Sequence, residues 1–148
     1  MSTRLALPFL LLLLGGCASA GKPWVELAGQ RYQVEIADEE PERQRGLMFR
    51  DRMDDDHGML FIHDFEEPLG YWMKNTRIPL DILYFDSQRK LVAQQRDVPP
   101  CSAGNACPTY PSGKPARYVL ELNAGQAARL QLENGAELGL SKNIPIAP

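Results

Sequence analysis

One short segment, Trp72-Met73-Lys74-Asn75-Thr76, brings together the side-chain types that small polar ligands need. The indole of Trp72 offers a flat apolar surface, while the Lys74 ammonium and the Asn75 amide offer directional hydrogen-bond donors. The Thr76 hydroxyl can donate or accept. This mix suits a sugar or a carboxylate, although ordinary turns contain the same residue types. We therefore expect these side chains to contribute to a ligand site.

Asp81 interrupts residues 78–85, a stretch that is otherwise apolar on both faces of the predicted strand. Strands of that kind are usually buried on both faces. A buried carboxylate must be paired or hydrogen-bonded, or it takes up a proton. Lys74 and Arg77 are the nearest cations in sequence. Two interpretations stay open: a structural ion pair that fixes the turn, or a carboxylate on the floor of a pocket shared with Lys74 and Asn75.

Methionine and histidine residues gather between positions 48 and 73, which is the composition that a copper site needs. Thioether and imidazole ligands suit Cu(I). Methionines in apolar surroundings more often fill gaps in a core. We therefore expect no metal and keep a periplasmic copper-binding protein as an alternative. Its candidate ligands are Met48, Met53, His57, Met59, His63 and Met73.

The sequence contains no familiar catalytic motif, neither a Gly-x-Ser-x-Gly elbow nor a His-Glu-x-x-His pair nor a phosphate-binding glycine loop. Lys74 and Asp81 are the pair that would support catalysis, as a base and the group that orients it. We expect a binding protein without a cofactor rather than an enzyme, and we keep this pair as the catalytic alternative.

The N-terminus indicates export. A positive charge precedes an apolar run, residues 5–14, that is too short to span a membrane. Residues 14–17, Leu-Gly-Gly-Cys, resemble the lipobox of bacterial lipoproteins, in which Cys17 is lipidated and cleavage falls before it. An ordinary signal peptide cleaved after Ala20 is the alternative. Residue 18, which follows the cysteine, is alanine and not aspartate. In this the chain resembles lipoproteins sorted to the outer membrane, so we expect it to be anchored on the periplasmic face of that membrane.

Lipidation of Cys17 leaves Cys101 and Cys107 as a pair, and export favours a disulfide between them. A metal-bound dithiolate and a redox pair are the alternatives. The pair lies in residues 99–115, a long segment rich in proline, glycine and serine. Ordered loops of that length are usually functional. We expect Tyr110, in this loop, to close over the candidate ligand site.

Hydrophobic periodicity predicts an α+β fold with a curled or barrel-like antiparallel sheet and two short helices. Strands are expected at residues 24–27, 32–36, 58–63, 69–73, 78–85, 91–98, 118–122 and 136–140, and helices at 38–45 and 123–134. The chain divides into a signal peptide (1–16), a tether (17–23), a single globular domain (24–141) and a C-terminal tail (142–148).

The charge balance indicates which partners to expect. The formal net charge is −3, and removal of the signal peptide takes away one positive charge, that of Arg4. The sequence has no basic stripe, so we expect no nucleic-acid partner. The expected partners are the membrane, through the lipid anchor, and a small polar ligand or a component of the cell envelope. A purely structural or interaction role is the alternative.

Four blocks of sequence, residues 42–48, 58–61, 72–81 and 118–122, resemble in order and spacing the domain-of-unknown-function family 192. The resemblance extends over residues 24–140 and implies a compact β-rich α+β fold with no assigned activity. The pair of Cys101 and Cys107 is similar to one in exported members. The positions that carry the resemblance are Gly46, Met48, Met59, Trp72, Lys74, Asn75, Thr76, Pro79 and Asp81.

Overall fold

The computed structural model describes residues 21–146, so the predicted signal peptide and Cys17 lie outside the described residues. The strands are β1 (Trp24–Leu27), β2 (Gln30–Ala37), β3 (His57–Trp72), β4 (Leu80–Phe85), β5 (Leu91–Val98), β6 (Thr109–Asn123) and β7 (Leu138–Leu140). The helices are α1 (Glu40–Arg45) and α2 (Gln126–Arg129), with a 3₁₀ turn η1 (Gly104–Ala106). None of the described helices is long and apolar enough to cross a membrane.

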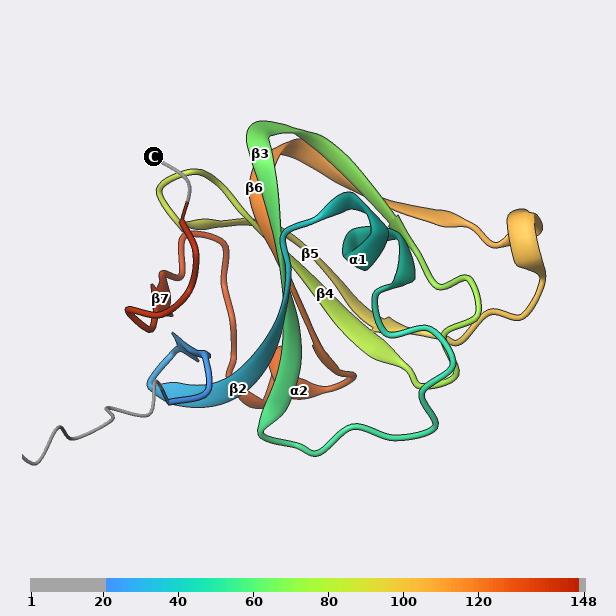
Figure 1. Ribbon diagram of the computed structural model, residues 1–148, viewed down its shortest axis with the longest axis horizontal. Coiled ribbons are helices and arrows are strands. Elements are labelled where there is room, and N and C mark those ends of the chain that lie inside the picture. Colours follow the sequence, from blue (N-terminus) through green and yellow to red (C-terminus); the bar gives the residue numbers. More distant parts are fainter. Residues whose placement is uncertain (1–20, 147–148) are drawn as a thin grey trace, which may run out of the picture.

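The described strands form one curled sheet in the order β5-β4-β6-β3-β2-β1-β7 (Figure 1). The predicted β-rich α+β fold with two short helices is confirmed. One pair differs from the expected antiparallel arrangement, because β2 and β3 run parallel. A parallel pair needs a crossover connection, and α1 lies in that connection.

The longest strands, β3 and β6, explain two differences from the sequence-based prediction. They pair from Gly58 with Leu122 to Trp72 with Thr109, with register shifts that mark bulges. A bulge interrupts the alternation of side chains, so β3 was expected as two separate strands. Residues 109–115 were expected as part of a loop because the segment is rich in proline, glycine and serine, whereas they belong to β6.

The helix α1 is short because its two ends are specified locally. At its start, Glu39 and Glu42 form a reciprocal capping box, which satisfies amides that the first turn leaves free. At its end, Gly46 has a φ of +46°. A Cβ at Gly46 would lie 3.2 Å from the ring of Phe61. Glycine therefore both ends α1 and lets the chain pass close to β3.

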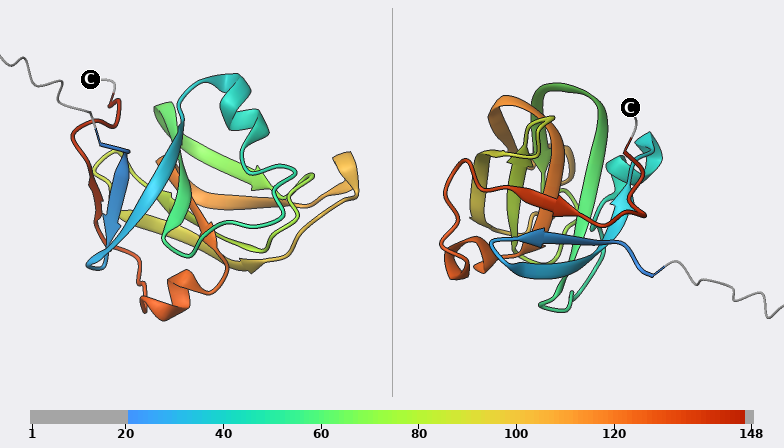
Figure 2. Two further views of the ribbon diagram at one scale, coloured as in Figure 1. Left: turned by 60° about the horizontal axis from the view of Figure 1, so that its bottom comes forward. Right: turned by 90° about the vertical axis from the view of Figure 1, so that its left-hand side faces the viewer.

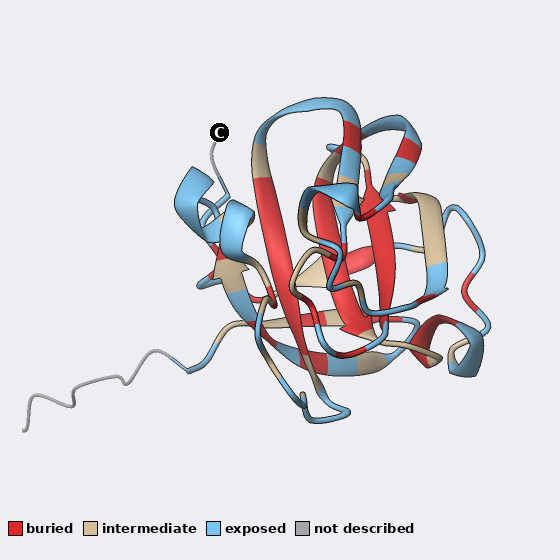
Figure 3. Ribbon diagram, turned by 90° about the vertical axis from the view of Figure 1, so that its right-hand side faces the viewer, coloured by how far each residue is buried: buried red, intermediate tan, exposed pale blue. Residues whose placement is uncertain are grey.

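The sheet is buried on both faces along its central strands (Figure 3). Every residue of β4 is buried, as its apolar pattern predicts. Because side chains alternate along a strand, Leu83 and Phe85 join one cluster, with Ala127 of α2. Ile82 and Tyr84 join the other, with Leu47, which follows α1. We call these sides the α2 face and the α1 face; Figure 2 shows the two helices from further directions.

The second helix is shorter than the predicted residues 123–134. Gly125 precedes it with a φ of +88°, and Gln131 follows it with a φ of +51°. Positive φ is incompatible with a continuing right-handed helix, so α2 keeps four residues.

Candidate functional site

Asp81 is fully buried on the α2 face, where two backbone amides donate to its carboxylate. Its Oδ1 accepts a hydrogen bond of 2.9 Å from the Asp97 amide, and its Oδ2 accepts one of 2.7 Å from the Ala127 amide. Asp97 has a φ of +51°, and Ala127 lies in the first turn of α2. Asp81 therefore joins β4 to an irregular point of β5 and to α2.

The predicted ion pair between Asp81 and Lys74 or Arg77 is wrong. Arg77 pairs with Asp51 at 2.9 Å, and the Lys74 ammonium donates to Asn105 Oδ1 at 2.7 Å. The prediction that Asp81 shares a pocket with Lys74 and Asn75 fails with it, as does the base-and-orienter pair, because both oxygens of Asp81 are taken up on the α2 face. Backbone amides leave no side-chain signal in a sequence, which is why they were not anticipated.

A small polar cavity lies instead on the α1 face, between α1, the end of β3 and β6. From α1 and the turn after it, the lining residues are Arg43, Gln44, Arg45, Gly46, Leu47 and Met48. From the strands and the segment after β3, they are Phe61, Tyr71, Trp72, Lys74, Thr76 and Glu121. The space open to the centre of a water-sized molecule is about 30 Å³, which is room for a small functional group.

Glu121 of β6 gives this cavity its most unusual feature. Its side chain lines the cavity, and the residue is only 4% exposed. Within residues 21–146, no group hydrogen-bonds to its carboxyl or forms an ion pair with it. Burial raises the pKa of Glu121 to about 8, because the charged form is disfavoured away from water. Glu121 is therefore mostly protonated at neutral pH.

Two tyrosines lie beside Glu121. The ring of Tyr71 packs edge-on against the rings of Phe61 and Tyr84, with centroids 5.0 Å and 6.0 Å apart. Burial, followed by the nearby Glu121 charge, raises the pKa of Tyr71 well above its usual value. The pKa of Tyr84 is raised by the same two causes in the same order. Both phenols therefore stay neutral, and neither forms an ion pair with Glu121.

The Tyr71 hydroxyl also contacts a histidine, with 2.9 Å between its oxygen and His63 Nε2. Burial, and to a smaller extent the charge of Arg43, lowers the pKa of His63. His63 is therefore neutral at pH 7 and above.

Lys74 and Trp72 form the outer rim of the cavity. The Lys74 Nζ lies 4.7 Å from the centroid of the Trp72 ring, which is cation–π geometry. Trp72 is 39% exposed. The rim thus offers a positive charge on an aromatic surface that solvent and a ligand can both reach.

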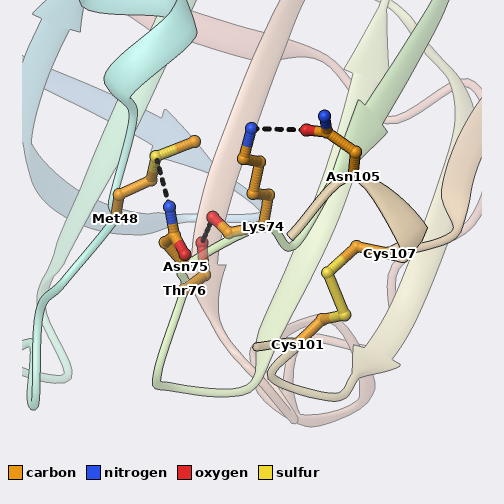
Figure 4. The surroundings of a disulfide bond; sticks show 7 residues. All are labelled: Met48, Lys74, Asn75, Thr76, Cys101, Asn105 and Cys107. Atoms are coloured by element: carbon orange, nitrogen blue, oxygen red, sulfur yellow. Dashed lines mark hydrogen bonds between the residues drawn. A yellow bond between two sulfur atoms is a disulfide. The ribbon is translucent and has the colours of Figure 1, made fainter. Parts of the chain in front are cut away.

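The disulfide loop positions the partner of Lys74. Cys101 and Cys107 are bonded, with 2.08 Å between their sulfur atoms, so the predicted disulfide is present. The loop between them carries η1 and Asn105, whose amide oxygen accepts from Lys74 (Figure 4). Cys101 also forms isolated backbone bridges with Lys74 and Thr76. The disulfide loop is therefore joined to the rim at both backbone and side-chain level.

Tyr110 does not close over the cavity as predicted. It lies in β6, packs against the core cluster of the α1 face, and its carbonyl oxygen accepts a hydrogen bond of 2.6 Å from the Tyr84 hydroxyl. Residue 110 belongs to a strand that pairs with β3, with Tyr110 opposite Tyr71, and that pairing fixes its place.

Asn75 is a turn residue rather than a lining residue. It has a φ of +56°, a conformation that asparagine tolerates better than most residues. Its backbone amide donates to the Cys101 carbonyl at 3.0 Å, and its carbonyl accepts from Phe49 at 2.8 Å. Its side-chain amide lies 3.9 Å from Met48 Sδ. Of the four predicted residues in this segment, Trp72, Lys74 and Thr76 line the cavity, while Asn75 connects the loops around it.

Four of the predicted soft-metal ligands have other surroundings than a metal site. Met59 and Met73 are buried in the core of the α1 face. His57 contacts Asp56 at 2.7 Å. His57 and His63 lie six positions apart on β3, about 20 Å along an extended strand, so one ion cannot bind both. Among the described residues, no group of three or more histidine, cysteine, aspartate or glutamate side chains could hold a metal.

Glu121 was not among the predicted site residues, although the sequence carries a signal for it. Residues 118–122 contain one acid among four apolar residues, which is the same pattern that drew attention to Asp81. Leu120 and Leu122 face α2, so Glu121 faces α1 together with Val119. Testing both faces of this strand for apolar neighbours would have identified a buried acid.

The model of the DUF192 family, described as Uncharacterized ACR, COG1430, matches residues 24–140. The chain belongs to this family. The family description assigns no activity, so function must be argued from the cavity.

Two solved structures are similar to this member of the DUF192 family. One, described as a proposed transcription regulator from Sinorhizobium meliloti 1021, is 37% identical with a TM-score of 0.74, over 84% of this chain and 98% of the other. A protein of unknown function from Novosphingobium aromaticivorans DSM 12444 is 28% identical with a TM-score of 0.71, over 93% and 99%. No curated protein matches this chain.

Proposed function

We propose that this DUF192 protein is an exported lipoprotein whose domain binds a small polar ligand in the cavity beside Trp72. The observation that carries the proposal is Glu121, a residue only 4% exposed whose side chain lines the cavity and has no partner among residues 21–146. Leaving a buried polar group unpaired costs about 1–3 kcal/mol. Groups of this kind, with perturbed pKa values in a cavity, cluster at functional sites.

The site predicted from sequence and the cavity overlap, which supports the same proposal. Trp72, Lys74 and Thr76 come from the segment expected to bind a ligand, and all three line the cavity that contains Glu121. A ligand there would meet an aromatic surface and a cation at the rim and a carboxyl inside.

The expected anchor suits this arrangement. β1, near the start of the described chain, and the disulfide loop lie toward opposite ends of the longest axis of the molecule (Figure 1). Lipidation at Cys17 would hold the β1 end close to the outer membrane. The rim with Lys74 and Asn105 would then face the periplasm, where a soluble ligand or an envelope component could reach it.

A purely structural role for the same segment is the second candidate, and Asn75 favours it. Its contacts to Cys101, Phe49 and Met48 join three loops, so the segment also contributes to the fold. The description of the Sinorhizobium relative as a regulator suggests DNA, but a formal net charge of −3 gives a phosphate backbone little attraction. We propose no nucleic-acid partner.

Tryptophan fluorescence tests the binding proposal. The chain has two tryptophans, so a Trp24→Phe variant leaves Trp72 at the rim as the sole emitter. Titration with a panel of sugars, carboxylates and amines should give a saturable change for at least one class. Lys74→Ala should weaken that response, whereas Lys90→Ala, which removes the partner of Glu137, should not. A panel without any response would contradict the proposal.

The anchor is tested separately by mass and fractionation. Cys17→Ser should abolish acyl incorporation and release the protein from the membrane fraction. Unchanged membrane retention of this variant would refute lipidation at Cys17, and the ligand proposal would stand independently of that result.

A further inference from the structure

Glu121, at the inner end of the cavity, forms no ion pair within the part of the chain that the structure describes, although Arg43, Arg45 and Lys74 line the same cavity. Glu121 lies opposite Met59 and Ile82 in the sheet, and Phe61 and Tyr71 form the nearby wall. Burial alone accounts for its raised pKa, and no basic side chain lowers it. The inner end is therefore suited to a group that brings its own positive charge or its own hydrogen-bond donors.

The outer end has the opposite character. The Lys74 ammonium has three donors, and Asn105 accepts from one of them. The cation rests on the exposed ring of Trp72. An anionic group of a ligand can take the remaining donors without entering the cavity. The two ends of the site thus favour opposite charges on the ligand.

We infer that the ligand carries a primary ammonium group that enters the cavity to meet Glu121, and an anionic group that stays at the rim beside Lys74. This inference rests on the proposed function and names its ligand class. The cavity leaves about 30 Å³ for the centre of a water-sized molecule. A primary ammonium on a methylene suits so small a space better than the bulkier trimethylammonium group.

Binding of such a ligand has a defined proton balance. At neutral pH the carboxyl O–H bond of Glu121 breaks as the ammonium arrives, and that proton passes to the buffer. The carboxylate and the ammonium then form a charge-assisted hydrogen bond in a site with little water, where such bonds are strong. A ligand with a hydroxyl in place of the ammonium can bind the protonated acid and releases no proton.

Glu121 is the group that titrates in this site between pH 7 and 9. The other titratable or charged groups around it are Arg43 and Arg45 beside α1, Tyr71 of β3, Tyr84 of β4, and Lys74 at the rim. Both tyrosines have pKa values above their usual range. His63, which contacts Tyr71, has a lowered pKa and is neutral in this window. The arginines stay charged.

The test is isothermal titration calorimetry of the mature protein, purified from membranes in detergent, with phosphoethanolamine as the probe. Paired buffers of different ionisation enthalpy should report about one proton released at pH 7. The affinity should rise about tenfold per pH unit below pH 8 and level off above it. Phosphocholine should bind at least a hundredfold more weakly, and glycerol 3-phosphate should release no proton.

Two variants sharpen the test. Glu121→Gln should weaken phosphoethanolamine binding at least a hundredfold and abolish proton release, because an amide cannot carry the countercharge. Glu137→Gln, a change at an exposed acid paired with Lys90, is the matched control and should behave as the unmodified protein. Soluble dihexanoylphosphatidylethanolamine distinguishes two sources of the ligand. Tighter binding than phosphoethanolamine identifies a lipid headgroup, and weaker binding identifies a free small molecule. Either result supports a ligand with a primary ammonium group.

The outcomes separate this inference from the proposed function. Failure of phosphoethanolamine to bind, binding without proton release, or full affinity in Glu121→Gln would overturn the inference. In each case a response of Trp72 to another class of compound would leave the binding site standing. If Trp72 also responds to nothing, both fall together.

Discussion

Two buried acids on opposite faces of the same sheet have opposite surroundings. Asp81 faces α2, and two backbone amides donate to its oxygens. Glu121 faces α1, lines a cavity, and has no partner within the described residues. The strands that carry them are adjacent, with Asp81 opposite Leu122 and Ile82 opposite Glu121. The two acids are thus offset by one residue in adjacent strands and point to opposite faces. One carboxyl stabilises the fold, and the other is available to a ligand.

The comparison shows that burial alone does not identify a functional acid. Both residues interrupt apolar strands, and both are buried. The difference lies in what donates to them. A carboxylate that accepts from backbone amides is fixed by the fold, whereas an unpaired one destabilises the fold until something else binds it.

The largest expected effect is on Asp81. Asp81→Ala should lower the free energy of unfolding by about 4 kcal/mol, because the Asp97 and Ala127 amides would remain buried without acceptors. Urea denaturation measures this. Asp51→Ala, which removes the exposed partner of Arg77, is the control and should cost less than about 1 kcal/mol. Equal costs for both variants would mean that Asp81 does not join α2 to β5.

The next largest effect on stability is expected for Glu121→Gln. Unlike Asp81→Ala, this substitution should make the protein more stable than the unmodified one at high pH. Its pKa rises from an ordinary 4.5 to about 8 on folding. Stability from the protonated acid is therefore complete below pH 4.5 and is lost as pH rises toward 8. Between pH 5 and 9, the protein should lose on the order of 3 kcal/mol relative to Glu121→Gln. Parallel pH profiles for the two proteins would show that Glu121 is solvated, and a profile that rises with pH relative to Glu121→Gln would show that it is paired.

The disulfide should have a moderate effect. Replacing Cys101 and Cys107 together by serine should lower the free energy of unfolding by about 2 kcal/mol, since the closed loop is short. The same change should loosen Asn105, and so weaken any ligand response reported by Trp72. Denaturation and fluorescence titration of one preparation test both. Lost stability with an unchanged ligand response would separate the disulfide loop from the site.

The smallest effect on stability is expected at the rim. Asn105→Ala should change the free energy of unfolding by less than about 1 kcal/mol, because its bond to Lys74 is exposed. Thermal denaturation should therefore give nearly the same midpoint as the unmodified protein. A loss as large as that of Asp81→Ala would favour the purely structural role of this segment.

Local patterns in the sequence predicted most of the fold. The helix expected at residues 38–45, the doubly apolar residues 78–85 and the strands expected at 24–27 and 32–36 all depend on neighbouring residues, and the structure has α1, β4, β1 and β2 at these places. The single long pairing of β3 with β6 could not be predicted in this way. Its bulges break the alternation, and its register depends on residues that are 37 positions apart at Trp72 and Thr109 and 64 apart at Gly58 and Leu122.

The site was only partly predictable for a related reason. Trp72, Lys74 and Thr76 are close in sequence, so their types indicated a binding segment. Glu121 reaches them only through the sheet, and Asn105 only through the disulfide loop. Asp81 drew attention because it is a buried acid, but its donors are backbone amides, which every sequence contains at every position except proline.

The most direct test of this account is a carbon-13 NMR titration of the Glu121 carboxyl in the mature chain. Assignment by comparison with Glu121→Gln allows its chemical shift to be followed from pH 4 to 10. The account predicts a midpoint near pH 8, as expected for an acid enclosed in the cavity without a partner. A midpoint near the ordinary value of 4.5 would show that this carboxyl is solvated or already paired, and would contradict the proposed site.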